Sequence, residues 1–231
     1  DALDALDSLD VVKLIPAYRV IVEADSPDLL RFDKMLPIVE AREEIIKRGQ
    51  MWAVERAEEM RVQADGLLDQ YQPQAAQDTL KDRKLVERFV DEKANQALRD
   101  LETRASTDLR LLEQAERRAR QAQRLAAENA LGAWDLLVEA YQTYAGATAL
   151  PEARQTIVGA MVESLQGLVR EAEAAFNQKR MDRIQRIYQG ARLDYADKDE
   201  TLDEWLAHLA EFDRQARAYE DYIRNAPGLV E

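Results

Sequence analysis

The sequence predicts an all-α protein, with long antiparallel helices in an elongated bundle that has coiled-coil-like packing. Glycine and proline are scarce, at 8 and 6 residues among 231, and strand-like runs of β-branched and aromatic residues are absent. Apolar residues recur every three or four positions through most of the chain, which is the spacing of one helix face. Charged residues make up 33% of the chain, as expected for helices that each bury one stripe and solvate the rest.

The N-terminal third is predicted to contain helices separated by prolines. Residues 14–21 carry a first helical stripe. The strongest helix-start signal is Ser26–Asp28, because serine can cap, proline suits the first helical position and aspartate favours the helix dipole. The helix that begins there is expected to break or bend at Pro37. A long helix is then predicted over 38–71, with Gly49 as a close-packing point.

The longest uninterrupted stretch lies between Pro73 and Gly132, where 58 residues contain neither glycine nor proline. Since those two residues are the strongest local breakers, the stretch predicts one very long helix or two collinear helices. The apolar positions of its second part recur at steps of three and four, and they are Leu98, Leu101, Ala105, Leu109, Leu112, Ala115, Ala119, Ala122, Ala126 and Ala130. From Ala115 onward this seam is alanine, which buries little area, so we expect any break between Ala115 and Gly132.

Beyond Gly132 the stripe becomes rich in large apolar residues and predicts further helices. A loop over 145–152 leads into a helix that carries apolar residues over 157–176. The stripe then resumes as far as Tyr188, so the pattern allows the same helix to continue to that residue. Residues 195–200 are polar and acidic and are predicted to form a turn.

The last helix is predicted over 202–223. Thr201 and Glu204 have the spacing of a capping box, in which the two side chains satisfy backbone groups at a helix start. The run Asn225–Gly228 contains a proline and a glycine, and it is expected to stop this helix.

These elements predict one elongated all-helical unit over 1–231. Helical hairpin regions over 12–73 and 132–225 would be joined by a long helix or a pair of helices over 74–131. The two hairpin regions place prolines and an aromatic residue at similar offsets. An internal duplication and a chance resemblance between amphipathic helices both remain open as explanations.

The net charge of −13 is concentrated at the two ends of the chain. Residues 1–30 carry seven acids and two bases, and residues 194–231 carry eleven acids and four bases. Such a chain repels nucleic acid and anionic lipid. We therefore expect protein partners, no nucleic-acid partner and no favoured membrane contact. Self-association along the alanine seam is a further expectation, because a thin seam can be left uncovered within one chain.

Cysteine is absent, so the chain has no disulfide framework and no thiol chemistry. No apolar run approaches the roughly 20 residues that a membrane-spanning helix needs, and no signal peptide is recognisable. A cytoplasmic location is therefore the default expectation. The chain begins at Asp1 without a methionine, which we interpret as a sign of processing or of a fragment of a larger protein.

Candidate chemistry is sparse, and the sequence predicts no catalytic, cofactor-binding or metal-binding residue. His208 is the single histidine. Triads, zinc sites and di-metal sites need a histidine with partners at set spacings, so we expect His208 at the surface or at the edge of a core. An acidic cluster lacks the glycine and the spacing of an EF-hand loop, which favours a solvated turn over a calcium site. Its members are Asp194, Asp197, Asp199, Glu200, Asp203 and Glu204.

Two further groups of residues allow a functional and a structural interpretation. An arginine cluster could contact an acidic partner or a phosphate group, but neighbouring glutamates favour a solvated, ion-paired face. The cluster consists of Arg117, Arg118, Arg120 and Arg124. The three tryptophans each lie on a helical stripe, which favours core packing over ligand stacking. They are Trp52, Trp134 and Trp205.

These observations leave three classes of function open. The leading one is a non-enzymatic helical scaffold or interaction module of a larger protein, which would act as a spacer, an oligomerisation element or a protein-docking surface. A regulatory subdomain of a multidomain signalling protein is the alternative. A lipid-binding or membrane-remodelling helical protein is less favoured, because the chain is acidic and has no lysine-rich helix face.

Overall fold

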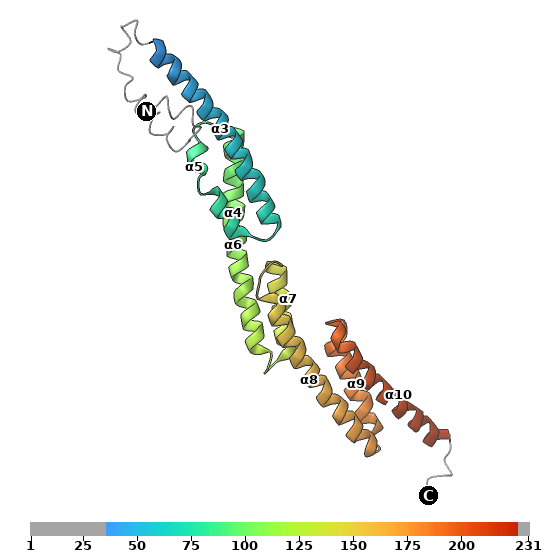
Figure 1. Ribbon diagram of the computed structural model, residues 1–231. Helices are drawn as coiled ribbons and strands as arrows, with labels where there is room; N and C mark the ends of the chain where they lie inside the picture. The colour runs from blue at the N-terminus through green and yellow to red at the C-terminus, as the bar shows by residue number, and fades with distance from the viewer. Residues whose placement is uncertain (1–35, 226–231) are drawn as a thin grey trace. The chain divides into compact units, whose positions relative to one another are not determined.

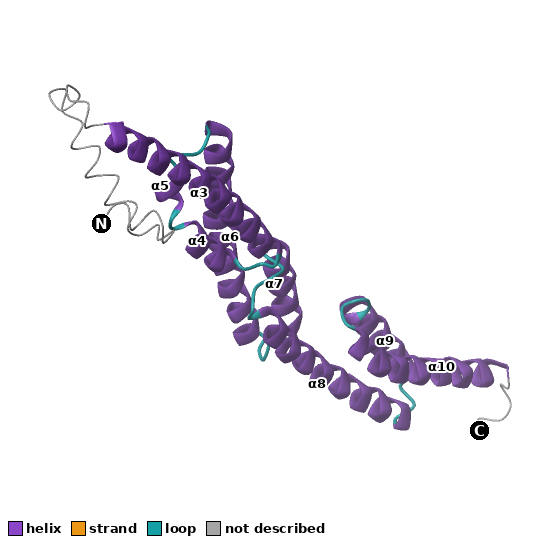
Figure 2. Ribbon diagram, turned by 45° about the horizontal axis from the view of Figure 1, so that its top comes forward, coloured by secondary structure: helices purple, strands orange, loops and turns teal. Residues whose placement is uncertain are grey.

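The structure, a computed structural model, describes residues 36–225, and for residues 36–43 and 45 it describes the backbone alone. Regular structure in this part of the chain is entirely helical, without a strand (Figures 1 and 2). The elements are α3 (Leu36–Asp69), α4 (Pro73–Leu80), α5 (Arg83–Val86), α6 (Glu92–Leu125), α7 (Ala130–Thr143), α8 (Leu150–Asn177), α9 (Met181–Tyr195), the 3₁₀ helix η3 (Glu200–Leu202) and α10 (Asp203–Asn225). The predicted all-α class is confirmed.

The chain divides into two compact units, residues 1–109 and 110–231, with the boundary inside α6. In the described part of the first unit, α3 packs against both α4 and α5. In the second unit, α8 packs against α7, α9 and α10, and α10 also packs against α9. The sequence did not indicate this division, because the apolar stripe of α6 runs through the boundary without interruption.

The core of the first unit is built from small and medium apolar side chains at helical spacing. α3 contributes the longest row. The fully or almost fully buried members are Ala53, Ala57, Met60, Ala64, Leu68, Ala76, Leu80, Val86, Leu98 and Ala105. Because alanine removes little apolar area from water, the larger side chains Met60 and Leu98 supply much of the buried surface here.

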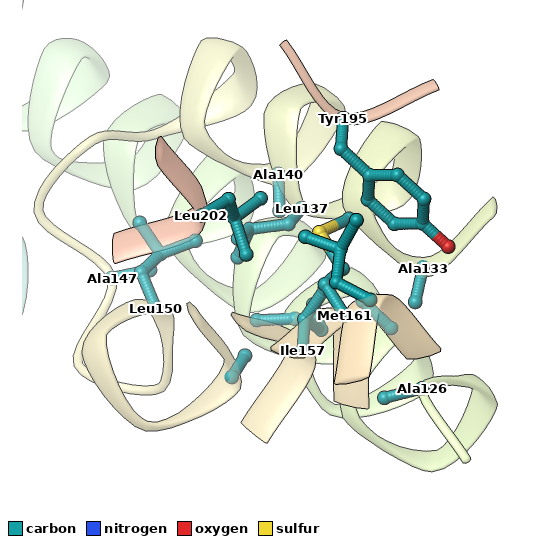
Figure 3. Close-up of a cluster of buried hydrophobic side chains, with 14 of the residues drawn as sticks. Ala126, Ala133, Leu137, Ala140, Ala147, Leu150, Ile157, Met161, Tyr195 and Leu202 are labelled. Atoms are coloured by element: carbon teal, nitrogen blue, oxygen red, sulfur yellow. The ribbon is translucent and has the colours of Figure 1, made fainter. Parts of the chain in front are cut away.

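The main core of the second unit covers the alanine seam of α6. Four alanines of the seam are buried in one cluster with large residues of α7 and α8, such as Leu137 and Ile157. The four are Ala115, Ala119, Ala122 and Ala126. Figure 3 shows Ala126 in this cluster. The seam is thus already covered within the chain, so the reason for expecting self-association along it no longer holds.

The Gly- and Pro-free stretch is not one rod or a collinear pair. It contains α4, α5 and α6, and α7 begins at its end. Short polar side chains cap the helices that begin after two of the breaks. Asp91 Oδ1 accepts a hydrogen bond from the Ala94 amide at 2.7 Å at the start of α6. Asn129 Oδ1 accepts one from the Gly132 amide at 2.9 Å at the start of α7. The break after Leu125 does fall in the predicted interval between Ala115 and Gly132.

The helix over 157–176 does not continue to Tyr188, because α8 ends at Asn177 and α9 begins at Met181. Lys179 has a positive φ of 56°. Its amide donates to Phe176 O at 2.9 Å, and the next amide donates to the carbonyl of Ala175 at 2.9 Å. These two bonds form a Schellman motif, whose left-handed position usually holds glycine. A lysine at this position gives no sequence signal for a helix end.

We predict that Lys179→Gly stabilises the second unit. Glycine adopts the left-handed conformation without the steric cost that a Cβ imposes, so the free energy of unfolding should rise by about 0.5–1 kcal/mol. Urea unfolding followed by circular dichroism measures this change. Gln178→Gly is the control, because Gln178 has a φ of −88° and its replacement should give no gain. Equal effects of the two substitutions would contradict the prediction.

Two smaller expectations are corrected by the structure. Pro37 lies in the first turn of α3, and the preceding helix that was expected to break or bend there lies outside the described residues. A Cβ on Gly49 would meet nothing within 4 Å, so Gly49 is not a close-packing point. Before α10, the capping side chain is Asp199 and not Thr201: Asp199 Oδ1 accepts from the Thr201 amide at 3.1 Å and from its hydroxyl at 2.8 Å.

The remaining sequence predictions for the C-terminal half agree with the structure. The loop predicted over 145–152 corresponds to residues 144–149, the acidic turn separates α9 from η3, and α10 ends at Asn225. The signals at 14–21 and Ser26–Asp28 lie outside the described residues.

Candidate functional site

A groove of about 240 Å³ opens on the first unit, between α3 and the start of α6. Its floor includes Ala57 and Leu98, which are 4% and 1% exposed. Val54 and Val90 add apolar walls. Among the described residues, the lining consists of Val54, Ala57, Glu58, Arg61, Val90, Asp91, Ala94 and Leu98.

The residues that shape the groove come from two local structures. The core stripe of α3 places Ala57 inward, which leaves Val54 and Glu58 on the neighbouring turns at the edge. The cap by Asp91 starts α6 and thereby sets the position of Ala94. A second bond supports this corner, because the side chain of Asn95 donates to the carbonyl of Glu87 at 2.9 Å.

Charged side chains lie among the apolar walls. Arg61 donates from Nε and Nη2 to the two carboxylate oxygens of Glu58 at 2.7 and 2.6 Å. These hydrogen bonds lower the pKa of Glu58 below its ordinary value. Glu58 is therefore ionised at neutral pH. Among the described residues, no lysine or arginine pairs with Asp91, whose carboxylate is exposed apart from its capping bond.

Exposed apolar side chains extend from the groove along α3. Val54 and Val62 are 56% and 57% exposed, and Met51 is exposed to a similar extent. Eleven residues, about three helical turns, separate Met51 from Val62, so these two share one face of α3. Val54 lies between that face and the core stripe. The surface that adjoins the groove is therefore partly apolar.

The groove offers apolar contact surface with charged groups at its edge. Among the residues that the structure describes, its lining has no serine, histidine or lysine. Its ionisable side chains are a mutually paired Glu58 and Arg61, and the capping Asp91. A proton donor at neutral pH would need a carboxyl with a raised pKa, and the pKa of Glu58 is shifted in the opposite direction. The groove can accept apolar side chains and can pair with one or two charges at its edge.

The other residues that the sequence drew attention to lie away from this groove, in the second unit. His208 is exposed, and its ring centroid lies 5.8 Å from that of Trp205. In the acidic turn, Asp199 forms an ion pair with Arg154 of α8 at 2.7 Å in addition to its capping bonds. Over residues 36–225 the structure brings together no group of three or more histidine, cysteine or acidic side chains that could hold a metal ion.

Three arginines of the cluster have polar partners, in line with the solvated-face interpretation. Arg117 pairs with Glu113 at 3.6 Å, and Arg120 pairs with Glu116 at 2.9 Å. Arg118 donates to the hydroxyl of Thr143 at 2.6 Å. All three tryptophans are partly buried against the apolar cores of their units.

Comparison with protein-family models, with curated proteins and with solved structures found no match to this chain. Within the described residues, no helix combines the length and the apolar character that crossing a membrane requires.

Sequence reasoning did not single out the groove, although one signal was present. The buried stripe of α3 consists of Ala53, Ala57, Met60, Ala64 and Leu68. Met51, Val54 and Val62 are apolar but fall off that stripe, at positions where a solvated helix face normally carries polar side chains. Apolar residues that lie outside the buried stripe of a helix indicate a second apolar surface on that helix.

Proposed function

We propose that this chain is a non-enzymatic helical interaction module of a larger protein, and that the groove between α3 and α6 is its protein-docking surface. The observation that carries the proposal is the apolar groove with exposed Val54 at its edge. A spacer alone would gain nothing from exposing valine and methionine side chains on a helix that already has a complete core stripe.

The energetics of the groove support a docking role. Full burial of a valine or methionine side chain is worth about 1.5–3 kcal/mol. Covering Val54, Met51 and Val62 would therefore supply several kilocalories per mole before the costs of association are subtracted. The surface is small compared with standard protein–protein interfaces. We accordingly propose a short apolar protein segment as the docked element.

The proposal includes the finer architecture that the sequence suggested. We propose that the helices within each unit run antiparallel and pack in a coiled-coil-like manner, as the rows of alanine and leucine at helical spacing favour. Elongation of the whole particle stays a prediction, which sedimentation velocity would check. The cytoplasmic location stays part of the proposal as well, and fractionation of cells that make the protein would test it.

Selection of displayed random peptides on the immobilised full chain tests the docking function. We expect the selected peptides to carry apolar residues together with lysine or arginine. Their affinity should fall at least about tenfold on Val54→Asp, because a charge at the groove edge opposes apolar burial.

Val138→Asp is the matched control for this experiment, because Val138 is an exposed valine on α7 of the second unit. The selected peptides should bind this variant as they bind the unchanged chain. Two results would overturn the proposal: no enrichment of apolar peptides, or equal binding to the Val54→Asp and Val138→Asp chains.

A further inference from the structure

We propose that an apolar segment of this same chain, residues 11–22, occupies the α3–α6 groove. The inference rests on the proposed docking function and names the occupant of that surface. Residues 1–35 lie outside the described residues, so the argument uses only their sequence and the structure of the groove.

The composition of residues 11–22 fits the groove. Nine of these twelve residues are apolar, and most of the nine are valine, leucine or isoleucine. The segment contains Lys13 and Arg19 but no acid, although acids surround it at Asp10 and Glu23. Burial of such side chains against Ala57, Leu98 and the two valine walls removes apolar surface of both partners from water.

The charges of the two parts are complementary. The groove lining carries Glu58 and Asp91 against a single base, and that base, Arg61, is engaged by Glu58. Among the side chains that the structure describes, Asp91 has its capping bond and no basic partner. Lys13 and Arg19 are the only bases in residues 1–30, and either can pair with this carboxylate at the groove edge.

The connection to α3 is long enough. Val54 lies 18 residues after the first residue of α3, a distance of about 27 Å along the helix axis. Residues 23–35 connect Val22 to α3, and an extended chain of that length spans up to about 45 Å. The segment can therefore return along α3 and reach the groove.

Covalent linkage favours this occupant over a second copy or a separate protein. A short connection gives an effective concentration of the order of 1 mM. A segment with an intrinsic dissociation constant of about 0.1 mM would then fill the groove about 90% of the time. A separate partner would have to compete with it.

Thiol labelling of the full chain tests the inference, because the chain contains no native cysteine. Val54→Cys reports on the groove edge. Val138→Cys is the control, since Val138 is an exposed valine on α7 of the second unit and does not belong to the groove or to the apolar surface beside it. Each cysteine is placed in the unchanged chain and in a chain that also carries Ile15→Asp and Ile21→Asp, and its reaction rate with a maleimide is measured.

We expect the two aspartates to raise the rate at position 54 about tenfold, as the loss of 90% occupancy requires, and to leave the rate at position 138 unchanged. Comparing the same cysteine in two backgrounds removes the influence of neighbouring glutamates on its reactivity. Circular dichroism checks that α-helix content is the same in all four chains. Lys13→Glu with Arg19→Glu should produce part of the same increase.

Three results would overturn the inference: equal rates at position 54 in both backgrounds, protection that disappears on dilution, or protection that appears only when another protein is added. Dilution-sensitive protection would assign the groove to a second copy. Failure of this test leaves the docking function standing if selected peptides still bind through Val54. If the peptide selection fails but position 54 is still protected from the maleimide, the groove binds residues 11–22 of its own chain and no separate protein.

Discussion

Ile157→Ala should lower the free energy of unfolding by about 2–5 kcal/mol, the range measured for deletions of this size in well-packed cores. Ile157 is fully buried in the main cluster of the second unit. Figure 3 shows it beside Met161 and close to Leu137 and Leu202. Much of the α6 surface in this cluster is alanine, whose side chain cannot move to fill a void, so we expect a value in the upper half of this range.

Urea unfolding with circular dichroism and with tryptophan fluorescence measures the effect. Leu193→Ala is the control within the same unit, because Leu193 is 86% exposed and its truncation should change stability by less than about 0.5 kcal/mol. A loss below about 1 kcal/mol for Ile157→Ala would show that this core is looser than the structure describes.

Glu116→Ala is the second substitution with a large expected effect. Glu116 Oε1 accepts three hydrogen bonds at the start of α8: from the Thr148 amide at 2.7 Å, from the Thr148 hydroxyl at 2.7 Å and from the Ala149 amide at 3.2 Å. The carboxylate thus joins α6 to the first turn of α8 and also favours the helix dipole there. Losing this carboxylate should lower the free energy of unfolding by about 1–3 kcal/mol.

The cost of Glu116→Ala should depend on pH. The hydrogen bond from the Thr148 hydroxyl, together with the two backbone amides and the nearby Arg120 charge, lowers the pKa of Glu116 below its ordinary value. A lowered folded-state pKa means that the charged carboxylate stabilises the fold above the unfolded-state pKa, which is about 4.3. This contribution is lost as the pH falls through the folded-state pKa. The difference between the two chains should therefore be largest above about pH 5 and should shrink on acidification.

Glu113→Ala is the matched control for this pH dependence. Glu113 lies on the same helix, is well exposed and pairs with Arg117 at 3.6 Å. An exposed ion pair of this kind contributes at most about 1 kcal/mol to the free energy of unfolding. Equal losses for Glu113→Ala and Glu116→Ala at pH 7, or a Glu116→Ala loss that does not change between pH 7 and pH 3, would contradict the role assigned to Glu116.

The all-α class and the buried helix faces could be predicted from the sequence. Burial of one face of a helix places apolar residues at a period of 3.6, and this period can be read directly in the sequence. The predicted stripe from Leu98 to Ala130 illustrates this: six of its ten positions are buried, and Leu101, Leu112 and Ala130 are partly buried against the two cores. Helix ends were less predictable, since the structure uses Asp91 and Asn129 as caps and Lys179 in a left-handed conformation. These residues also occur within helices, so they are weaker signals than glycine or proline.

The sequence by itself determined the all-α class, the acidic charge and the buried face of each long helix, because those properties follow from composition and periodicity alone. Only the tertiary structure decided which apolar surface stays uncovered. Ala119 and Val54 are both small apolar residues on long helices, yet α7 and α8 contribute to the core that buries Ala119, while Val54 stands at an open groove. Periodicity says which residues share a face of a helix. Coverage of that face depends on where the other helices end and pack.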